Sequence, residues 1–559
     1  MKDELRSFIA SIVKELFNED IAIELTVPDE QFGDFATNAA MQLAKALKQN
    51  PREVAAQLVS IINAKGYEGL ESASLAGPGF INFRIASPSL VKQMYTQPTK
   101  SYQDKVVVTE YSDPSSFKVL HAGHLYTSVV GDVLANLYEE AGARVHRVNF
   151  GGDVGLHVAK TMWAILHVLG GEFPDKLAEV PEAGRTEWMS ARYVEGNAIY
   201  DDDEQAKAEI IGLNKRIYGL HETHDHDSPF AKIYWTCRQW SYDYFDWFYA
   251  QIGSHFERYY PESETMPIGV KTVLEQLKNG VYEESDGAIV FRGEKYGLHT
   301  RVFINSQGLP TYEAKDVGLS MEKWSDYHFD LSVILTDSAQ APYMAVVIKS
   351  IEQFAPNLAN STKHLTHGRV KLSGGQKMSS RMGNIVRAVD VLEMARVANR
   401  ELTGKDDPET VLGAVKYAFL KSRLGGDVIY DPKESVSLEG NSGPYLQYSH
   451  ARARSIIRKA TNVEPAAVDA LSGLEPGERL FARKLGQYSV TVDDALKDSM
   501  PHYIATYLYE LAQVFNRFYE HNRVLGGDRE AIRLALLHRY ADVLKSGLGL
   551  LGITAPERM

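Results

Sequence analysis

The stretch "VTEYSDPSSFKVLHAGHLYTS", residues 108–128, decides the fold of the region around it. It extends the apolar, β-branched run "KVVVTEYS" (105–112), which predicts a strand. It leads into "AGHLYTSVVGDVLANLYEEAG" (122–142), whose apolar spacing predicts a helix that ends at a glycine. A second strand and a glycine turn, "RVHRVNFGGD" (144–153), follow. This strand–helix–strand order favours a parallel sheet with a right-handed crossover.

Two histidines and a glycine occupy the turn between the first strand and the helix. Ligands of open parallel sheets bind beyond the carboxyl ends of the strands, where "HAGH" (121–124) and "GGD" (151–153) both fall. Unpaired amides at a helix N-terminus attract anions, and Gly123 would let a flat base or ribose approach the backbone. The pair could also ligate a metal, but no third ligand stands at a suitable spacing. Taken alone, such a pair more often marks a solvated polar turn.

Length, charge and cysteine content limit the classes of protein to which the chain can belong. At 559 residues it is too long for one hydrophobic core, so several domains are expected. A net charge of −13 argues against a protein that simply coats nucleic acid, although residues 441–559 are close to neutral and could bind it locally. A solvated helical face explains that charge balance equally well. Cys237 is the only cysteine, which excludes an internal disulfide and a cysteine-based zinc cluster.

The sequence pattern divides the chain into three parts. Residues 1–95 predict a small α+β domain, and residues 104–385 an α/β domain interrupted by an acidic, helical insertion at about 166–280. Three segments between residues 287 and 340, "GAIVFRG", "HTRVFINSQGLPTYEAKD" and "FDLSVILTDSAQ", return to β periodicity and predict the second half of the sheet. Residues 386–559 predict an all-α region of antiparallel-bundle type.

A second polar segment, "KLSGGQKMSSRMGN" (371–384), follows some way after the histidines. A glycine- and serine-rich loop that carries Lys377 suits the neutralisation of a polyphosphate. On its own the segment is equally typical of a basic surface loop. Together with "HAGH" in one α/β chain, it favours a site for a phosphorylated ligand.

These two segments resemble the paired signatures, HIGH and KMSKS, of the class I aminoacyl-tRNA synthetases. Other segments narrow the resemblance to the arginyl-tRNA synthetase family and follow that family's order along nearly the whole chain. They are "GDFATNAAMQLAK" (33–45), "AGPGFINF" (76–83), "EYSDPSSFKVLHAGHL" (110–125), "TYEAKD" (311–316), "EGNSGPYLQYSHAR" (439–452) and "LGLLGITAPERM" (548–559).

The resemblance implies a fold and a reaction. The fold would be a Rossmann-type catalytic core with a helical insertion, a small N-terminal α+β domain that binds tRNA, and a C-terminal helical bundle that binds the anticodon. The chain would activate L-arginine with ATP to arginyl-adenylate and then transfer arginine to the terminal ribose of its tRNA. Mg²⁺ would accompany ATP, zinc would not be needed, and activation would require tRNA. We expect a cytoplasmic monomer without membrane contact, because no apolar run is long enough to cross a bilayer.

The resemblance also assigns roles to single residues. The catalytic residues would be His121, His124, Lys377 and Lys118. ATP would contact Gly123, Gly151, Gly152, Asp153, Met378 and Ser379. Arginine would contact Glu110, Ser112, Ser115, Tyr312, Asp316 and Gln340, since a planar guanidinium calls for paired carboxylates. Asp316 could instead be an exposed charge or helix cap, and Tyr312 a half-buried packing residue.

Two departures from the family pattern affect these roles. Ser115 stands where the family has asparagine, so a contact to the amino group of the substrate would be shortened or mediated by water. The second signature reads "KMSSR" (377–381), with Ser380 where many relatives have a second lysine. We hypothesise that Lys118 supplies the missing positive charge.

Residues at both ends of the chain are expected to bind tRNA. Phe80 would stack on a base and Asn82 would contact a base edge, although the family commonly has tyrosine in place of Phe80 and "GFINF" also reads as a plain hydrophobic strand. Tyr448 and Arg452 share a helix face and suit splayed anticodon bases, and Met559 would close that surface. A packing tyrosine, a surface ion pair and a frayed terminus are the alternatives.

Other functions also fit part of the pattern. Nucleotidyltransferases use a similar histidine motif but are usually much shorter and have no use for a tRNA-binding helical tail. A non-catalytic tRNA-binding paralogue would be expected to have lost the histidines, the lysine and the carboxylates, which are all present here. Another class I synthetase specific for cysteine would need zinc ligands that this chain lacks.

Overall fold

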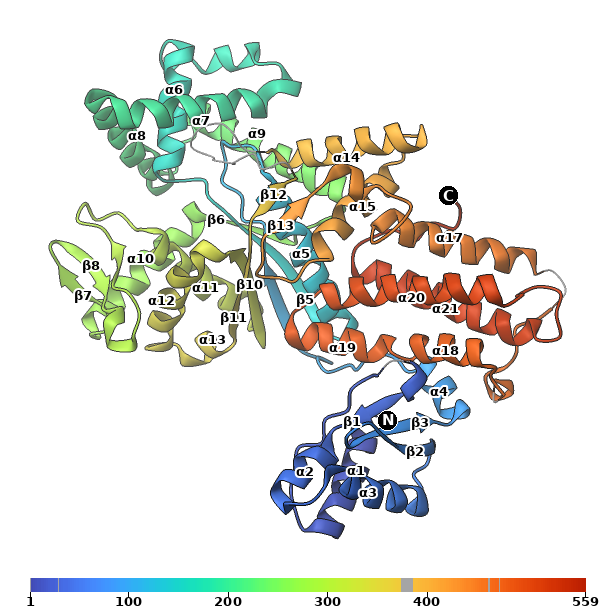
Figure 1. Ribbon diagram of the computed structural model, residues 1–559. Helices are drawn as coiled ribbons and strands as arrows, with labels where there is room; N and C mark the ends of the chain where they lie inside the picture. The colour runs from blue at the N-terminus through green and yellow to red at the C-terminus, as the bar shows by residue number, and fades with distance from the viewer. Residues whose placement is uncertain (1, 29, 374–385, 461–462, 472) are drawn as a thin grey trace.

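The computed structural model describes residues 2–28, 30–373, 386–460, 463–471 and 473–559. Three parts follow one another along the chain: a small N-terminal part, a central part built on a parallel sheet, and a helical C-terminal part (Figure 1). In the described ranges, no helix has the length and apolar character needed to cross a membrane.

The N-terminal part packs helices against a small antiparallel sheet of order β1-β3-β2. Its elements are α1 (Lys2–Phe17), β1 (Phe35–Thr37), α2 (Ala39–Leu47), α3 (Pro51–Lys65), β2 (Leu70–Ala76) and β3 (Phe80–Ile85). The Asn50 side chain accepts a hydrogen bond from the Arg52 amide, and Pro51 occupies the first position of α3. This capping chemistry explains why one helix ends and another begins here.

The central part contains the predicted parallel sheet. Its strands are β4 (Val106–Glu110), β5 (Arg144–Gly151), β6 (Arg258–Pro261), β10 (Leu331–Asp337) and β11 (Thr362–His367). Every pairing is parallel, in the order β11-β10-β4-β5-β6. After β4, the chain adds β5 and β6 on one side of it, and later adds β10 and β11 on the other side. The strand order therefore reverses between β4 and β10, and such a reversal opens a crevice at the carboxyl ends of the strands.

Helices cover both faces of this sheet. Val107 of β4 belongs to the core that contains α5 (Ala122–Glu140), while its neighbour Val108 belongs to the core of α11 (Tyr312–Tyr327) and α12 (Ala341–Glu352). Helix α10 (Glu262–Lys278) crosses α11 at close range. A Cβ at Gly269 of α10 would lie 1.9 Å from the carbonyl oxygen of Ala314, so only glycine permits this approach.

Two expectations about strand placement are wrong. The strands β7 (Glu283–Ser285), β8 (Ala288–Phe291) and β9 (Arg301–Ile304) form a separate antiparallel sheet, and only β10 of that region joins the main sheet. Conversely, β6 lies inside the segment 166–280 that was expected to be helical. Local β periodicity does not reveal which sheet a strand joins, because the partner strands are distant in sequence.

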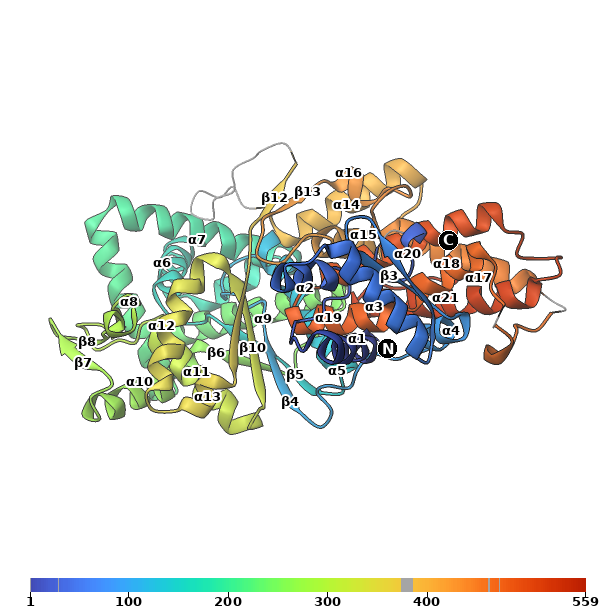
Figure 2. The same cartoon turned by 60° about the horizontal axis from the view of Figure 1, so that its bottom comes forward.

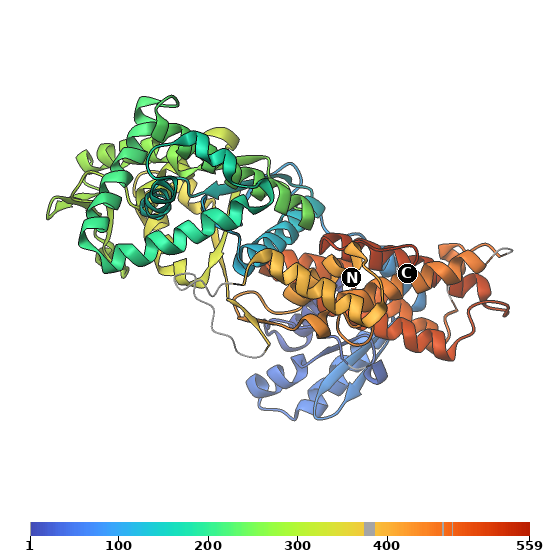
Figure 3. The same cartoon turned by 90° about the horizontal axis from the view of Figure 1, so that it is seen from above.

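The insertion forms a helical layer with its own core. Its main helices are α6 (Leu156–Leu169), α7 (Arg185–Asp202), α8 (Glu204–Thr223) and α9 (Pro229–Ile252). Cys237 is buried in this core, as expected for a packing thiol. Figure 3 shows these helices in green, on the opposite side of the molecule from the red C-terminal helices.

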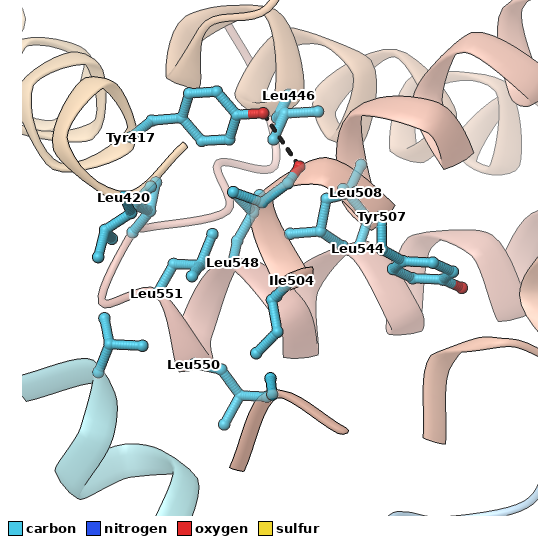
Figure 4. Close-up of a cluster of buried hydrophobic side chains, with 14 of the residues drawn as sticks. Tyr417, Leu420, Leu446, Ile504, Tyr507, Leu508, Leu544, Leu548, Leu550 and Leu551 are labelled. Carbon is cyan, nitrogen blue, oxygen red and sulfur yellow. Dashed lines mark hydrogen bonds between the residues drawn. The ribbon is translucent and has the colours of Figure 1, made fainter. Parts of the chain in front are cut away.

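The C-terminal part is mainly helical, as predicted, although β13 (Val428–Tyr430) pairs in parallel with β12 (Val370–Leu372). Its helices are α14 (Ala388–Thr403), α15 (Pro408–Leu420), α16 (Pro432–Ser435), α17 (Gly443–Lys459), α18 (Pro476–Leu485), α19 (Tyr488–Asp498), α20 (His502–His521) and α21 (Glu530–Leu550). Figure 4 shows their leucine-rich core, in which the Tyr417 hydroxyl donates to the Ala505 carbonyl at 3.0 Å. The N-terminal part lies against this bundle beside α4 (Ser87–Met94) and α18 (Figure 2).

Candidate active site

The candidate site lies at the carboxyl edge of the parallel sheet, where the strand order reverses. Strand β4 ends there at Glu110, β5 at Gly151 and β6 at Pro261, directly before α10 begins with Glu262. His121 is the N-cap residue of α5 at the same edge. The topology therefore collects residues from distant parts of the chain in one place.

His121 and His124 form a stacked pair at the N-terminus of α5. Their ring centroids are 3.8 Å apart, and the ring planes are inclined by 29°. Nδ1 of His121 accepts a hydrogen bond from the Gly123 amide at 3.0 Å, and Nδ1 of His124 accepts one from the His121 amide at 3.1 Å. A nitrogen that accepts carries no proton, so each neutral ring is protonated at Nε2. Within the described residues neither Nε2–H group has a partner, and both can donate to a ligand.

Both imidazoles are held in the neutral form. Burial lowers the pKa of His121 to about 4, with smaller contributions from the positive charge of Lys118 and from His367. Burial, together with the facing His121 ring, also lowers the pKa of His124 well below its usual value. The pair can therefore donate hydrogen bonds to a phosphate, but the positive charge that phosphates require must come from other residues.

Gly123 is required by the His121 side chain itself. A Cβ at this position would lie 2.8 Å from Cε1 of His121, because the imidazole folds back to reach the Gly123 amide. From the sequence, we expected Gly123 to allow a base or ribose to approach the backbone. The structure adds an intramolecular reason, since the histidine pair could not adopt this geometry beside a larger residue.

Lys118 places a positive charge near the histidine pair. Its ammonium group lies 4.2 Å from the ring centroid of Tyr193, which belongs to α7 of the insertion. Burial lowers the pKa of Lys118 to about 8, although Glu262 opposes the shift. The lysine thus remains largely charged at neutral pH and loses charge above it. Sequence reasoning missed Tyr193, because nothing local connects it with the site.

The glycine turn after β5 is joined to the loop that precedes the histidines. The Gly152 amide donates to the Pro114 carbonyl at 3.1 Å, and the Gly152 carbonyl accepts from the Ser116 amide at 2.8 Å. A Cβ at Gly152 would lie 3.3 Å from Oγ of Ser115 and 3.4 Å from Oε1 of Glu262. Ser115, which replaces the expected asparagine, therefore lies close to Glu262 across a bare backbone.

Asp153 follows the two glycines of the turn after β5. It is fully buried, and its carboxylate accepts hydrogen bonds from the Ser263 amide at 2.9 Å and the Ser263 hydroxyl at 2.7 Å. Arg238 donates to the same carboxylate at 2.8 Å. The expected contact of Asp153 with ATP stays a prediction. A side chain with no exposed surface can act on a ligand only by holding Arg238 and the beginning of α10.

The two expected arginine carboxylates both lie at this edge, in different states. Glu110 forms an ion pair with Lys323 of α11, and the side chains are 3% and 1% exposed. Asp316 is also buried, yet no hydrogen bond or ion pair joins it to another residue in the part of the chain that the structure describes. Burial and the negative charge of Glu110 raise the pKa of Asp316 well above its usual value. A buried carboxylate without a partner is a candidate receptor for a cation.

Sequence reasoning missed several polar and charged residues at this edge of the sheet. Lys315 and Glu262 form a second buried ion pair at 2.5 Å, and Nε2 of His157 donates to the Gly152 carbonyl at 3.3 Å. One signal was available. Lys323 lies seven positions after Asp316 and so shares its helix face, and lysine is rarely buried without a partner.

The remaining expected arginine contacts differ in accessibility. Tyr312, the first residue of α11, is 58% exposed, and its ring centroid lies 5.1 Å from the Lys315 ammonium. Gln340 is exposed in the turn after β10. Ser112 is buried with a φ of +76°, and its hydroxyl bonds to that of Tyr249 at 2.7 Å. Tyr312 and Gln340 are thus accessible, while Ser112 holds a strained turn.

The second signature falls outside the described residues. This applies to Lys377, Met378 and Ser379. On one side of the gap, the Ser373 amide donates to the Tyr430 carbonyl at 2.9 Å. On the other side, the Ala122 amide of α5 donates to the Val386 carbonyl at 2.9 Å. The chain after the gap is therefore joined directly to the helix that carries the histidine pair.

The expected tRNA contacts of the N-terminal part lie on β3. Phe80 is 40% exposed, and Asn82 lies two positions later on the same side of the strand but is buried. Phe80 is thus accessible to a stacking base, and Asn82 is largely covered.

The expected contacts of the C-terminal part gather around α17. Tyr448 is 45% exposed there, and the Arg452 guanidinium lies 4.7 Å from the ring centroid of Tyr519. The chain end returns to this helix, because His450 bonds to the Pro556 carbonyl at 2.8 Å and Arg454 to Glu557 at 2.8 Å. Met559, two residues further on, is partly exposed beside α17.

Comparisons with known protein families cover nearly the whole chain. Residues 1–85 match the arginyl tRNA synthetase N terminal domain, residues 86–430 the catalytic domain of tRNA synthetases class I (R), and residues 446–559 the DALR anticodon binding domain. An arginine–tRNA ligase of Bdellovibrio bacteriovorus is 30% identical over 95% of this chain and 93% of that protein. One of Phocaeicola vulgatus is 28% identical over the full length of both.

Solved structures share the fold. The arginyl-tRNA synthetase of Thermus thermophilus superimposes with a TM-score of 0.80 at 24% identity and covers all of both chains. That of Plasmodium falciparum gives a TM-score of 0.81 at 21% identity and covers 100% of this chain and 99% of its own. The arrangement of all three parts is therefore the one that these proteins have.

Proposed function

The chain belongs to the arginyl-tRNA synthetase family, which charges tRNA with arginine, and on this premise we propose how its residues divide the reaction. One observation carries the assignment. A neutral histidine pair and a buried carboxylate, Asp316, lie at the same reversal of the sheet; among the described residues, neither the two Nε2–H donors nor this carboxylate has a partner. The first suits a phosphate and the second suits a guanidinium. A shorter nucleotidyltransferase would have no use for the C-terminal part.

We propose that ATP lies over α5 with its phosphates at the histidine pair. His121 and His124 donate hydrogen bonds, while Lys118 and Lys377 supply positive charge as pyrophosphate leaves. The nucleotide contacts are assigned to Gly123, Gly151, Gly152, Met378 and Ser379. Asp153 contributes indirectly through Arg238. A Mg²⁺ ion is proposed to accompany ATP through the phosphate oxygens.

The amino-acid side of the site is assigned to the neighbouring strand ends. Asp316 and Glu110 receive the guanidinium, and Tyr312 covers its aliphatic stem. Ser115 and Gln340 bind the α-amino and carboxylate end, and Ser112 shapes the turn beneath them. The arginine carboxylate then attacks the α-phosphorus to give arginyl-adenylate. No covalent intermediate with the protein is needed, because positioning and electrostatics suffice.

We propose that tRNA spans the N- and C-terminal parts and brings its acceptor end to the adenylate. Phe80 stacks on a base with Asn82 behind it, and Tyr448, Arg452 and Met559 contact the anticodon. The tRNA-binding parts are assigned to residues 1–95 and 386–559 and the chemistry to residues 104–385. We propose that the protein acts as a monomer where translation occurs, in the cytoplasm. Arginine activation is proposed to require bound tRNA.

The decisive experiment is arginine-dependent exchange of pyrophosphate into ATP, with and without tRNA. Exchange that needs both arginine and tRNA is the expected result. Exchange without tRNA would contradict the proposed dependence, and exchange with another amino acid would contradict the arginine site. No exchange under any condition would favour a non-catalytic tRNA-binding protein.

A further inference from the structure

Lys323, the buried ion-pair partner of Glu110, has no place in the reaction as described above. Lys323 lies on α11, 213 positions after its partner on β4, and its ammonium also contacts the Ser332 hydroxyl at 3.3 Å. Neither side chain reaches solvent to any useful extent. A buried lysine loses both hydration and rotamer freedom, so the pair contributes little net stability by itself. Its position beside Asp316 suggests a role in recognition.

An inventory of the charges around Asp316 shows what Lys323 does there. The groups that act on Asp316 are Glu110 from β4, Glu262 from α10, Lys323 from α11 itself and Asp113 from the turn after β4. Two of these acids have their own cation, because Glu110 pairs with Lys323 and Glu262 with Lys315. Each of these two buried lysines thus neutralises the charge of one carboxylate.

The remaining acids are Asp113 and Asp316. Asp113 accepts a hydrogen bond from the Phe150 amide at 2.8 Å; burial and the charge of Glu110 raise the pKa of both Asp113 and Asp316 well above the usual value, so the two resist carrying two negative charges at once. Asp316 has neither a cation nor a hydrogen-bond donor among the described residues. When one cation binds Asp316, the net charge of this cluster of side chains becomes zero.

We propose that Lys323 is a positioning residue for arginine recognition: by cancelling the charge of Glu110 inside the protein, it leaves Asp316 as the single uncompensated acid and so matches the site to one guanidinium. This inference rests on the proposed arginine site and deepens it. Without Lys323, two uncancelled carboxylates would face one another in a buried site. Like charges so placed cannot both ionise readily, so the pair would hold a proton that arginine must displace.

The proton held by these carboxylates determines how arginine binding changes with pH. Arginine binds the ionised carboxylates, so kcat/KM for arginine rises with pH as the cluster loses its proton. Removing the lysine charge makes that proton harder to remove and shifts the rising limb to higher pH, by about 1–2 pH units. At neutral pH the KM for arginine would increase about tenfold to a hundredfold, as such a shift implies. The KM for ATP would not change.

The test measures tRNA-supported pyrophosphate exchange against arginine concentration and pH. Lys323→Met removes the charge but keeps the bulk, and it should move the rising limb upward. Lys323→Arg keeps the charge and should restore the wild-type profile. Lys207→Met, which breaks an exposed pair with Glu204 on α8, is the matched control and should behave as wild type. A Lys323→Met protein that loses thermal stability but keeps the wild-type arginine KM and pH profile would overturn the proposal.

A second variant covers the case in which Lys323→Met fails to fold. The double substitution Glu110→Gln with Lys323→Met removes both charges and leaves no unpaired buried ion. It should fold and return the rising limb to its wild-type position, because Asp316 is again the only uncancelled acid. A rising limb that stays at a higher pH than in the wild-type protein would overturn the proposal. Asp316→Asn tests the underlying site separately: if it leaves the arginine KM unchanged, the proposed arginine site fails whatever Lys323 does.

Discussion

Two of the regions that bury charge in this molecule treat it in opposite ways. At the junction between the N-terminal part and α18, Asp34 accepts hydrogen bonds from Arg479 at 2.6 Å and from the Ile85 amide at 2.7 Å, and Arg483 lies 3.4 Å away. Arg479 also donates to the Ile85 carbonyl at 2.6 Å. At the sheet edge, by contrast, Asp316 is buried with no partner among the described residues.

Asp34 therefore has a structural role, whereas Asp316 is left to bind a ligand. A buried ion whose hydrogen bonds are satisfied fixes two parts of a protein relative to each other, and removing one partner is costly. A buried ion left without a partner destabilises the protein and persists where a ligand completes it. Substitutions at the junction should therefore reduce stability and spare the chemistry, and substitutions at the sheet edge should do the reverse.

The largest effect is expected at the junction. Arg479→Ala leaves Asp34 buried and without its main partner, which should destabilise the docking of the N-terminal part by about 3–5 kcal/mol. Thermal unfolding followed by limited proteolysis would show early release of this part, and the KM for tRNA would rise while the KM for arginine stays constant. Arg396→Ala, which breaks an exposed pair with Glu393 on α14, is the matched control. Equal stability of the two variants would contradict the architectural role.

A substitution in the histidine pair should do the opposite: it should slow the reaction and leave stability almost unchanged. His124→Ala removes one Nε2–H donor from the phosphate site and should lower kcat by about a hundredfold to a thousandfold, the usual cost of losing one donor to developing charge. The unfolding temperature should change little, because the ring is neutral and makes one backbone hydrogen bond. A protein that unfolds early but reacts at the normal rate would show that the pair only caps the helix.

Asp316→Asn should impair arginine binding while it stabilises the fold. Loss of a charged hydrogen bond to the guanidinium should raise the KM for arginine about tenfold to a hundredfold, from roughly 1.5–3 kcal/mol. Because the pKa of Asp316 is raised in the folded protein, ionisation of this group costs stability as the pH rises above the ordinary carboxyl range. The stability advantage of the variant should therefore grow from acidic to neutral pH. Thermal unfolding at several pH values would measure it, and a decrease in stability would contradict the comparison.

The smallest effect is expected at the tRNA-binding surface that the junction holds in place. Phe80→Ala removes a partly exposed stacking surface and should raise the KM for tRNA about fivefold, the lower end of what one stacked base contributes. Stability and the KM for arginine should not change. In the Arg479→Ala background the same substitution should have a smaller effect, because Phe80 is then no longer held in register with the C-terminal part. Full additivity would mean that the junction does not position Phe80.

Much of the fold and part of the site could be predicted from the sequence, because they depend on local patterns. The turn that places His121 and His124 before α5 follows from an apolar strand, a helix start and a glycine, all within a short segment. The helical insertion and the C-terminal helices follow from apolar periodicity. The resemblance then supplied candidate roles for Glu110 and Asp316, whose contacts it could not describe.

What only the tertiary structure decided are the pairings between distant segments. Sequence patterns placed β8 and β9 in the main sheet and missed β6, since a strand does not encode its partner. They also gave no indication that Lys323 would pair with Glu110, Lys315 with Glu262, or Lys118 with Tyr193. Local sequence fixes backbone conformation through short-range sterics and hydrogen bonds. Which buried charges are cancelled, and which one is left for the substrate, depends on where the folded chain brings them together.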